Sequence, residues 1–187
     1  MSPPSPRIAI TGPESSGKSV LAGWLAATWR TRWVPEFARE YLLALPDPGA
    51  YTLADLEAIA RGQLAAESQR VGLLPAGAPL FCDTDLLVIL IWAEERFGHC
   101  PAWLRTAALD PTAYHLRLLL HPDLPWEPDP LREAPDPAER ARLFQRYRAT
   151  LRAANLPFTE ICGTGEARYA AAARAVTAAG FGQLPTR

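Results

Sequence analysis

Hydrophobic positions in this chain form short apolar runs that alternate with longer segments in which apolar residues recur every three or four positions. The short runs predict buried strands at residues 7–11, 32–34, 79–83, 115–120 and 158–161. The longer segments predict helices at residues 18–30, 36–45, 52–64, 86–97, 138–155 and 166–179. Strands therefore alternate with helices along the sequence.

Local sequence features support two of the helical segments. Thr52 followed by Asp55 is a capping-box pattern, which predicts a helix start at that point. The apolar run at residues 86–93 fits either a buried strand or a buried helix by composition. We predict a helix that continues to Phe97, because a strand ending at Asp83 leaves little room for a second one.

This alternation indicates an α/β fold, in which a parallel five-stranded sheet has helices on both faces and binds ligands at the carboxyl ends of its strands. A length of 187 residues is typical of one domain, so we take residues 1–187 as a single unit. Residues 121–137 hold six prolines among charged residues, which predicts a loop.

Composition narrows the classes of function. Hydrophobic residues make up 49 % of the chain, yet no apolar run approaches the ~20 residues that cross a bilayer, and the first residues lack a signal-peptide pattern. A net charge of -1 provides no general attraction to nucleic acid. The three cysteines lie far apart, which indicates neither a disulfide framework nor a zinc site. We expect a soluble cytoplasmic protein without nucleic-acid or membrane partners; its oligomeric state stays open.

The lone lysine is the most informative single residue. Eighteen of the nineteen basic residues are arginine, and Lys18 lies within Gly12-Pro13-Glu14-Ser15-Ser16-Gly17-Lys18-Ser19. This stretch matches the phosphate-loop pattern and lies between a predicted strand and a predicted helix. In such a loop, backbone N–H groups hold phosphates, the lysine neutralises phosphate charge and the serine binds magnesium. We therefore expect ATP and Mg²⁺ to bind at Gly12, Glu14, Ser15, Ser16, Gly17, Lys18 and Ser19; a chance match in an ordinary loop is the alternative.

Two carboxylates follow the predicted strand at residues 79–83. Asp83 ends this strand, where it is placed to bind magnesium through water or to take the proton of an acceptor hydroxyl. Asp85 is a candidate for binding the acceptor, although capping the next helix explains it equally well.

A second candidate acceptor motif follows the strand at residues 32–34. Glu36 and Arg39 share one helical face there, close to the predicted strand ends. A carboxylate at that position is suited to hold sugar hydroxyls or to act as a base. The alternative is a solvent-exposed ion pair.

The proline-rich segment at residues 121–137 is a candidate lid. Phosphoryl transfer requires exclusion of water and neutralisation of the phosphate oxygens, and Arg132 on a closing loop is able to provide both. Trp126, in the same segment, is a candidate lid residue that binds the acceptor. An ordinary surface loop is the alternative.

Other nucleotide-binding patterns are absent from the sequence. With a single lysine there is no N-K-x-D element for guanine, and there is no G-x-G-x-x-G dinucleotide pattern. The three histidines show no metal-ligand spacing. ATP is therefore the expected nucleotide.

Several motifs together resemble the ribosylnicotinamide kinase domain of the NadR family over about residues 7–180. They are Gly-Pro-Glu-Ser-Ser-Gly-Lys-Ser at 12–19, Pro-Glu-Phe-Ala-Arg-Glu-Tyr at 35–41, Asp-Thr-Asp at 83–85, and Asp-Leu-Pro-Trp at 123–126 with Asp129 and Arg132. The resemblance implies a P-loop NTPase fold of the nucleoside/nucleotide kinase type with a lid loop. It also implies transfer of the ATP γ-phosphate to the 5′-hydroxyl of nicotinamide riboside, giving nicotinamide mononucleotide.

The resemblance also implies roles for individual residues. Lys18 and Ser19 serve ATP and magnesium. Glu36, Arg39 and Asp83 serve the acceptor side of the site, and residues 126–132 form the lid. Larger members also carry a nucleotidyltransferase and sometimes a DNA-binding domain, which we do not expect in 187 residues.

One position departs from the family pattern. Pro35 stands directly before Glu36, where some members have tryptophan. The aromatic residue that stacks on the acceptor ring therefore stays open among Trp33, Tyr41 and Trp126.

Two other functions remain possible at this point. The first is a kinase for another nucleoside or small metabolite, because fold and phosphate loop do not specify the acceptor. The second is a regulatory ATP-binding module with slow hydrolysis. A kinase releases ADP when an acceptor is added, whereas a regulatory module binds ATP and a protein partner without one.

Overall fold

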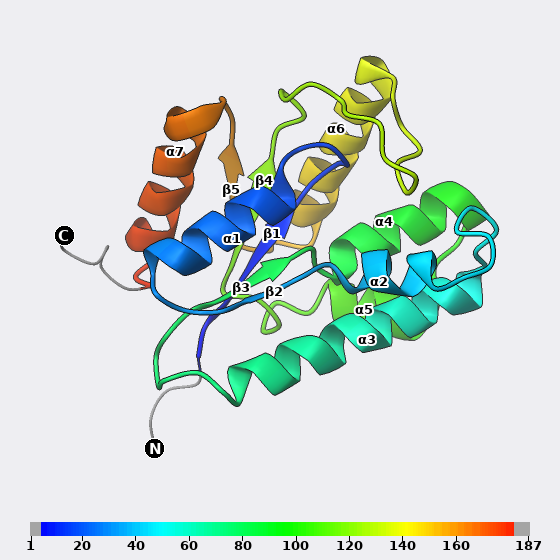
Figure 1. The fold of residues 1–187 in the computed structure, drawn as a ribbon. Coiled ribbons are helices and arrows are strands. Elements are labelled where there is room, and N and C mark those ends of the chain that lie inside the picture. The colour runs from blue at the N-terminus through cyan, green and yellow to red at the C-terminus, as the bar shows by residue number, and fades with distance from the viewer. Residues whose placement is uncertain (1–4, 182–187) are drawn as a thin grey trace.

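The computed structural model of the chain describes residues 5–181. They contain a five-stranded parallel sheet with the strand order β2-β3-β1-β4-β5 (Figure 1). The strands are β1 (Arg7–Thr11), β2 (Trp33–Val34), β3 (Leu80–Asp83), β4 (Leu116–Leu120) and β5 (Phe158–Ile161). In the register, Ile8 of β1 is opposite Phe81 of β3 and Leu116 of β4. The predicted α/β fold is confirmed.

Helices connect the strands. They are α1 (Lys18–Thr28), α2 (Phe37–Leu43), α3 (Leu53–Val71), α4 (Leu86–Phe97), α5 (Ala102–Ala108), α6 (Pro137–Ala153) and α7 (Gly165–Ala178). Within residues 5–181, none of them has both the length and the apolar character needed to span a membrane. The expectation for the first residues concerns a segment that lies partly outside the described range, which begins at residue 5.

Helix α5 was not predicted from the sequence. It has seven residues, of which Leu104 and Ala108 are buried, so it is too short to show a helical period. The ambiguous run at residues 86–93 is helical, as predicted. The Asp85 carboxylate accepts a hydrogen bond from the Val88 amide at the start of α4, and Gly98 with φ 73° ends the helix.

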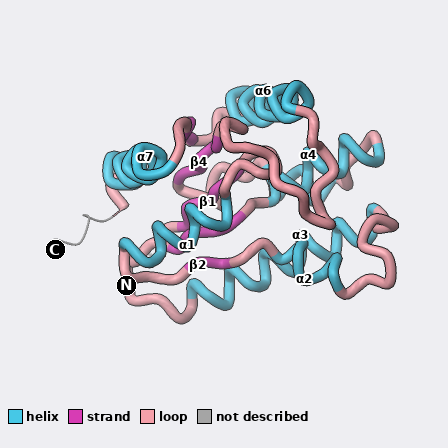
Figure 2. Tube along the Cα trace, turned by 45° about the horizontal axis from the view of Figure 1, so that its top comes forward, coloured by secondary structure: helices cyan, strands magenta, loops and turns pink. Residues whose placement is uncertain are grey.

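The sheet separates two apolar layers. On one face, Ile8 and Ile10 of β1 pack with buried residues of α1 and α7. On the other face, Leu119 of β4 belongs to a cluster that includes buried residues of α3, α4 and α6. Figure 2 shows α7 and α4 well apart, with strands between them. Helices on both faces leave the carboxyl ends of the strands as the edge where loops meet.

The topology brings three loops together at that edge. Strands β3 and β4 flank β1, so the loop after β1 lies between the end of β3 and the segment that follows β4. Gly12 is required at the start of the central loop: its φ is 135°, and a Cβ atom there would lie 2.8 Å from the carbonyl oxygen of Leu120. The loop and the end of β4 are therefore in direct contact.

A fully buried ion pair lies beneath this edge. Arg117 of β4 donates through Nε to Asp85 Oδ2 at 2.9 Å, and both side chains are completely buried. Asp85 Oδ1 also accepts from the Thr11 hydroxyl at 3.0 Å. The ring of Tyr114 lies 5.0 Å from the Arg117 guanidinium. This pair links β1, β4 and the start of α4.

We expect Arg117→Met to reduce the free energy of unfolding by about 3–5 kcal/mol, because the Asp85 carboxylate then stays buried without its counter-ion. Urea unfolding measures the loss. The double variant Arg117→Met, Asp85→Asn should recover part of it, since no unpaired charge remains. A single variant within about 0.5 kcal/mol of the parent would show that the pair contributes little.

Candidate functional site

A cavity of about 800 Å³ lies at the carboxyl ends of the strands. The phosphate loop forms one end of its lining, and the start of α2, the end of β3, helix α4, residues 129–134 and helix α6 form the rest. The sequence-predicted site residues that line it are Gly12, Glu14, Ser15, Ser16, Gly17, Lys18, Ser19, Glu36, Arg39, Asp83 and Arg132. Residues far apart in the sequence thus meet around one space.

The phosphate loop is held by hydrogen bonds to its backbone carbonyls. Lys18 Nζ donates to the carbonyls of Gly12 and Pro13 at 3.2 and 3.1 Å. The Ser16 hydroxyl donates to the Pro13 carbonyl at 2.7 Å. Gly17 adopts a left-handed conformation with φ 82° directly before α1. The Lys18 ammonium is therefore already placed over the loop that the sequence assigns to phosphates.

Two buried arginines hold the same loop from the helices that follow the lid. Arg140 of α6 and Arg168 of α7 are each 3 % exposed. Arg140 Nη2 donates to the Ser15 carbonyl at 3.4 Å, and Arg168 Nη2 donates to the Ser16 carbonyl at 2.6 Å. Neither residue stands out in the sequence, because most arginines in helical segments are solvent-exposed.

Among the carboxylates of the site, Asp83 is the one whose pKa is raised by its surroundings. It ends β3, is 1 % exposed, and its Oδ1 has no hydrogen-bond partner among the described residues. Burial and the neighbouring Glu36 carboxylate raise its pKa to about 6, against the lowering effect of Ser19 and Lys18. A buried carboxylate oxygen without a partner, close to a serine hydroxyl, fits a hard cation such as Mg²⁺.

Helix α3 positions Glu36, the residue that precedes α2. The Phe37 amide donates to Gln63 Oε1 at 3.0 Å, and Gln63 Nε2 donates to Glu67 at 3.2 Å. Gly62 leaves space for the Phe37 ring, since a Cβ atom at Gly62 would lie 2.1 Å from that ring. No sequence pattern predicts the contact between Phe37 and Gln63, because these residues belong to two separate helices.

Arg39 connects α2 to the lid. Its Nη2 atom lies 2.8 Å from Asp129 Oδ2, and this hydrogen bond raises the pKa of Arg39 and lowers that of Asp129. The Arg39 side chain is 55 % exposed, so screening by solvent limits the energy of the pair. Arg132 lies three residues further along the lid and lines the cavity.

Two predicted acceptor residues lie elsewhere. Asp85 is fully buried, does not line the cavity, and is occupied by Thr11, Arg117 and the Val88 amide. Asp85 therefore has the position of the alternative given above, a helix cap. Trp126 is also outside the cavity lining, and its indole N–H donates to Glu14 Oε1 at 3.0 Å. Its position is that of a lid residue in contact with the phosphate loop.

Aromatic side chains form part of the cavity lining. Of the three predicted candidates, Trp33 lines the cavity, whereas Tyr41 and Trp126 do not. The structure adds Trp92 of α4 and Tyr147 of α6. Sequence reasoning placed both on apolar helical segments, where core packing is the ordinary explanation.

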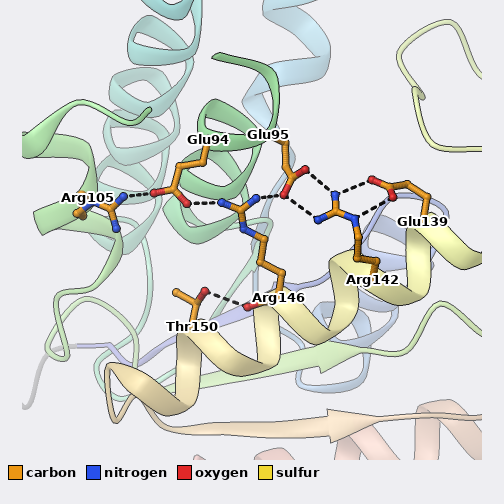
Figure 3. Close-up of polar contacts among 7 residues, drawn as sticks. All are labelled: Glu94, Glu95, Arg105, Glu139, Arg142, Arg146 and Thr150. Carbon is orange, nitrogen blue, oxygen red and sulfur yellow. Dashed lines mark hydrogen bonds and ion pairs between the residues drawn. The ribbon is translucent and has the colours of Figure 1, made fainter. Parts of the chain in front are cut away.

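Ion pairs join helix α4 to helix α6 beside the cavity (Figure 3). Arg142 contacts Glu139 at 2.7 Å and also pairs with Glu95, and both carboxylates line the cavity. Arg146 binds Glu94 at 2.6 Å and also contacts Glu95. The first turns of α6, which directly follow the lid, are therefore tied to the cavity wall formed by α4.

Among curated proteins, this chain is similar to part of a much longer protein. The chain is 28 % identical over 156 residues to the trifunctional NAD biosynthesis/regulator protein NadR of Salmonella typhimurium. The match covers 82 % of this chain and 37 % of the relative. The chain therefore spans well under half the length of that relative.

Solved structures show the same fold. The chain superposes on a NadR protein in complex with NAD and AMP-PNP with a TM-score of 0.79 at 22 % identity, covering 98 % of this chain and 52 % of that chain. A NadR protein in complex with NR gives a TM-score of 0.78 at 21 % identity, covering 98 % and 53 %. Deoxyadenosine kinase from M. mycoides gives 0.60 at 11 % identity, covering 92 % and 99 %.

A protein-family model described as an AAA domain matches residues 7–168. The matched range runs from β1 through the phosphate loop, the end of β3 and the lid into α7. It thus contains every residue that the sequence analysis placed in the site. Because the match covers most of the chain, this protein belongs to that AAA domain family, and its fold is the P-loop fold shared by nucleoside and nucleotide kinases.

Proposed function

We propose that this protein transfers the γ-phosphate of ATP to the 5′-hydroxyl of nicotinamide riboside and so forms nicotinamide mononucleotide. The observation that carries the proposal is the single cavity that joins the phosphate loop, the Asp83–Glu36 carboxylates and an aromatic wall. The similarity to NadR, solved with NR and with AMP-PNP, supports the same reaction for this chain. We place the reaction in the cytoplasm, where ATP is available.

The phosphate loop provides the electrostatic part of the reaction. Its backbone N–H groups and Lys18 hold the β- and γ-phosphates, so that charge moving onto the leaving oxygen is neutralised at a fixed position. Ser19 would hold Mg²⁺, which supplies further positive charge to the phosphates, and Asp83 would contact the ion only through a water molecule. Arg132 would add a guanidinium from the lid side of the cavity.

Asp83 and Glu36 provide the acceptor side. The Thr84 hydroxyl lies 3.5 Å from Glu36 Oε1, which keeps this carboxylate close to the end of β3. A carboxylate with a pKa of about 6 is deprotonated at neutral pH but remains a usable proton acceptor, as a general base requires. Asp83 is thus suited to take the proton of the attacking 5′-hydroxyl.

The wall of the cavity suits a positively charged ring. Nicotinamide riboside carries a pyridinium cation, and Trp33, Trp92 and Tyr147 are the aromatic side chains that line the space. A desolvated cation–π contact contributes up to about 2 kcal/mol. Glu95 at the same wall adds a carboxylate, although Arg142 and Arg146 pair with it.

The direct test is ADP release from ATP and Mg²⁺ with a panel of acceptors. We expect release with nicotinamide riboside and none above background without an acceptor. Uncharged nucleosides should give a kcat/KM lower by at least about tenfold, because they lose the cation–π contribution. Equal activity on uncharged nucleosides would favour the alternative, a kinase for another nucleoside, and binding of ATP without turnover would favour a regulatory module.

Replacement of the lone lysine tests the phosphate loop. Lys18→Ala should lower kcat at least about 10²-fold, because one positive charge is removed from the transferring phosphate. Thermal unfolding should stay close to that of the parent protein, since the ammonium contacts loop carbonyls and not the core. Retention of most of the turnover would contradict the role given to Lys18.

Replacement of Asp83 should have opposite effects on turnover and stability. Asp83→Asn should lower kcat more than it raises the KM for ATP, since a base acts mainly in the transition state. The folded-state pKa of about 6 lies above the ordinary 3.8, so ionised Asp83 destabilises the fold above pH 6 by up to about 3 kcal/mol.

Chemical denaturation at several pH values measures the second effect. The folded protein binds the Asp83 proton more tightly than the unfolded chain, so this group lowers stability as the pH rises from about 4 to about 6. Asp83→Asn should therefore be more stable than the parent protein at pH 8, with an advantage that shrinks toward pH 4. A variant less stable at pH 8 and unchanged in kcat would return Asp83 to a structural role.

A further inference from the structure

Glu14 is an unexpected residue within an anion-binding loop. A carboxylate beside bound polyphosphate is repelled by it unless the charge is engaged elsewhere. In the structure both Glu14 oxygens are engaged by the lid. Oε1 accepts from the Trp126 indole at 3.0 Å and from the Ala134 amide at 2.7 Å, and Oε2 accepts from the Glu133 amide at 2.9 Å.

These three donors lie on both sides of the lid residue Arg132. Glu133 and Ala134 follow it directly, so Glu14 fixes the backbone immediately after Arg132. Trp126 precedes Glu127, whose carbonyl accepts a hydrogen bond from Arg132 Nη1. One carboxylate of the phosphate loop therefore holds both ends of the turn that carries the arginine.

Further contacts keep this turn in a single arrangement. The Arg132 amide donates to the Asp129 carbonyl at 3.1 Å, and the Glu127 amide donates to the Ser15 hydroxyl at 3.3 Å. The lid is thus hydrogen-bonded to the phosphate loop at two consecutive residues, Glu14 and Ser15. Hydrogen bonds to an ionised acceptor are about twice as strong as neutral ones, so the Glu14 contacts dominate.

We propose that Glu14 is a positioning residue, which directs Arg132 toward the transferring phosphate by anchoring the lid turn to the phosphate loop. The proposal rests on the proposed kinase function, because it assigns Glu14 a role in phosphoryl transfer. It also explains why a carboxylate is compatible with an ATP site: its charge is directed to lid N–H groups. Loss of the anchor misplaces Arg132, and misplacement by about 1 Å costs on the order of 10²-fold in rate.

A double-mutant cycle tests this coupling on the full chain. Glu14→Ala and Arg132→Ala should each lower kcat for the acceptor that the parent protein phosphorylates best, by about 10- to 100-fold. In the Arg132→Ala background, Glu14→Ala should lower kcat by less than about twofold, since no arginine remains to be positioned. Independent, multiplying effects would overturn the proposal.

ATP affinity separates positioning from direct nucleotide binding. Glu14→Ala should change the dissociation constant for a non-hydrolysable ATP analogue, measured without acceptor, by less than about threefold. If the analogue binds much more weakly and kcat at saturating ATP is unchanged, Glu14 serves the nucleotide directly and the proposal fails. Hydrogen exchange at residues 133–134 should become faster in the variant, and unchanged exchange would contradict the anchor.

Milder substitutions provide a graded readout. Trp126→Phe removes one of the three donors and keeps an aromatic ring, so it should reduce kcat less than Glu14→Ala does. Glu166→Ala is the matched control, because Glu166 is an exposed glutamate of α7 outside the cavity lining. Equal losses in all three variants would point to a general fold defect and overturn the proposal.

The cycle also separates this proposal from the proposed function. If nicotinamide riboside is not phosphorylated but another acceptor is, the acceptor assignment fails while the Glu14–Arg132 coupling is still measured with that acceptor. If nicotinamide riboside is phosphorylated and the two effects multiply, the function stands and the positioning role fails.

Discussion

The site depends on buried guanidinium groups that join the phosphate loop to residues 121–124, the start of the candidate lid. Arg140 donates to the carbonyls of Ser15, Pro122 and Leu124, and Arg168 donates to those of Ser16 and His121. A planar guanidinium offers several donors in fixed directions, so one side chain holds carbonyls from two segments at once. Because both arginines come from helices packed on the sheet, the position of the loop and of the lid follows from the core.

The cavity is lined by side chains of both charges. Lys18 and Arg132 both line the cavity, whereas the carboxylate of Glu14 accepts hydrogen bonds from the amides of Glu133 and Ala134. At Asp83, burial and the Glu36 carboxylate raise the pKa to about 6, so the folded protein keeps an energetically unfavourable anion at the end of β3. Ionised Asp83 therefore lowers the free energy of unfolding.

The buried Asp85–Arg117 pair gives the carboxyl edge of the sheet a fixed geometry. It links the end of β1, the interior of β4 and the first turn of α4. Helices α4 and α6 are joined to each other by the ion pairs of Arg142 and Arg146 with Glu95 and Glu94 (Figure 3). The cavity is therefore bounded by charged groups that are paired with one another across several elements.

The sequence by itself determined the α/β fold, the strand and helix positions and the phosphate loop, because hydrophobic period, caps and glycine spacing are local properties. It missed α5, whose seven residues are too short for a period. It left open whether Asp85 binds the acceptor or caps a helix, and which aromatic residue faces the ring. Only the tertiary structure shows that Asp85 is buried against Arg117 at the start of α4 and that Trp33 and Trp92 line the cavity, since these positions depend on contacts between residues distant in the chain. The same holds for Glu14, whose oxygens meet donors more than a hundred positions away.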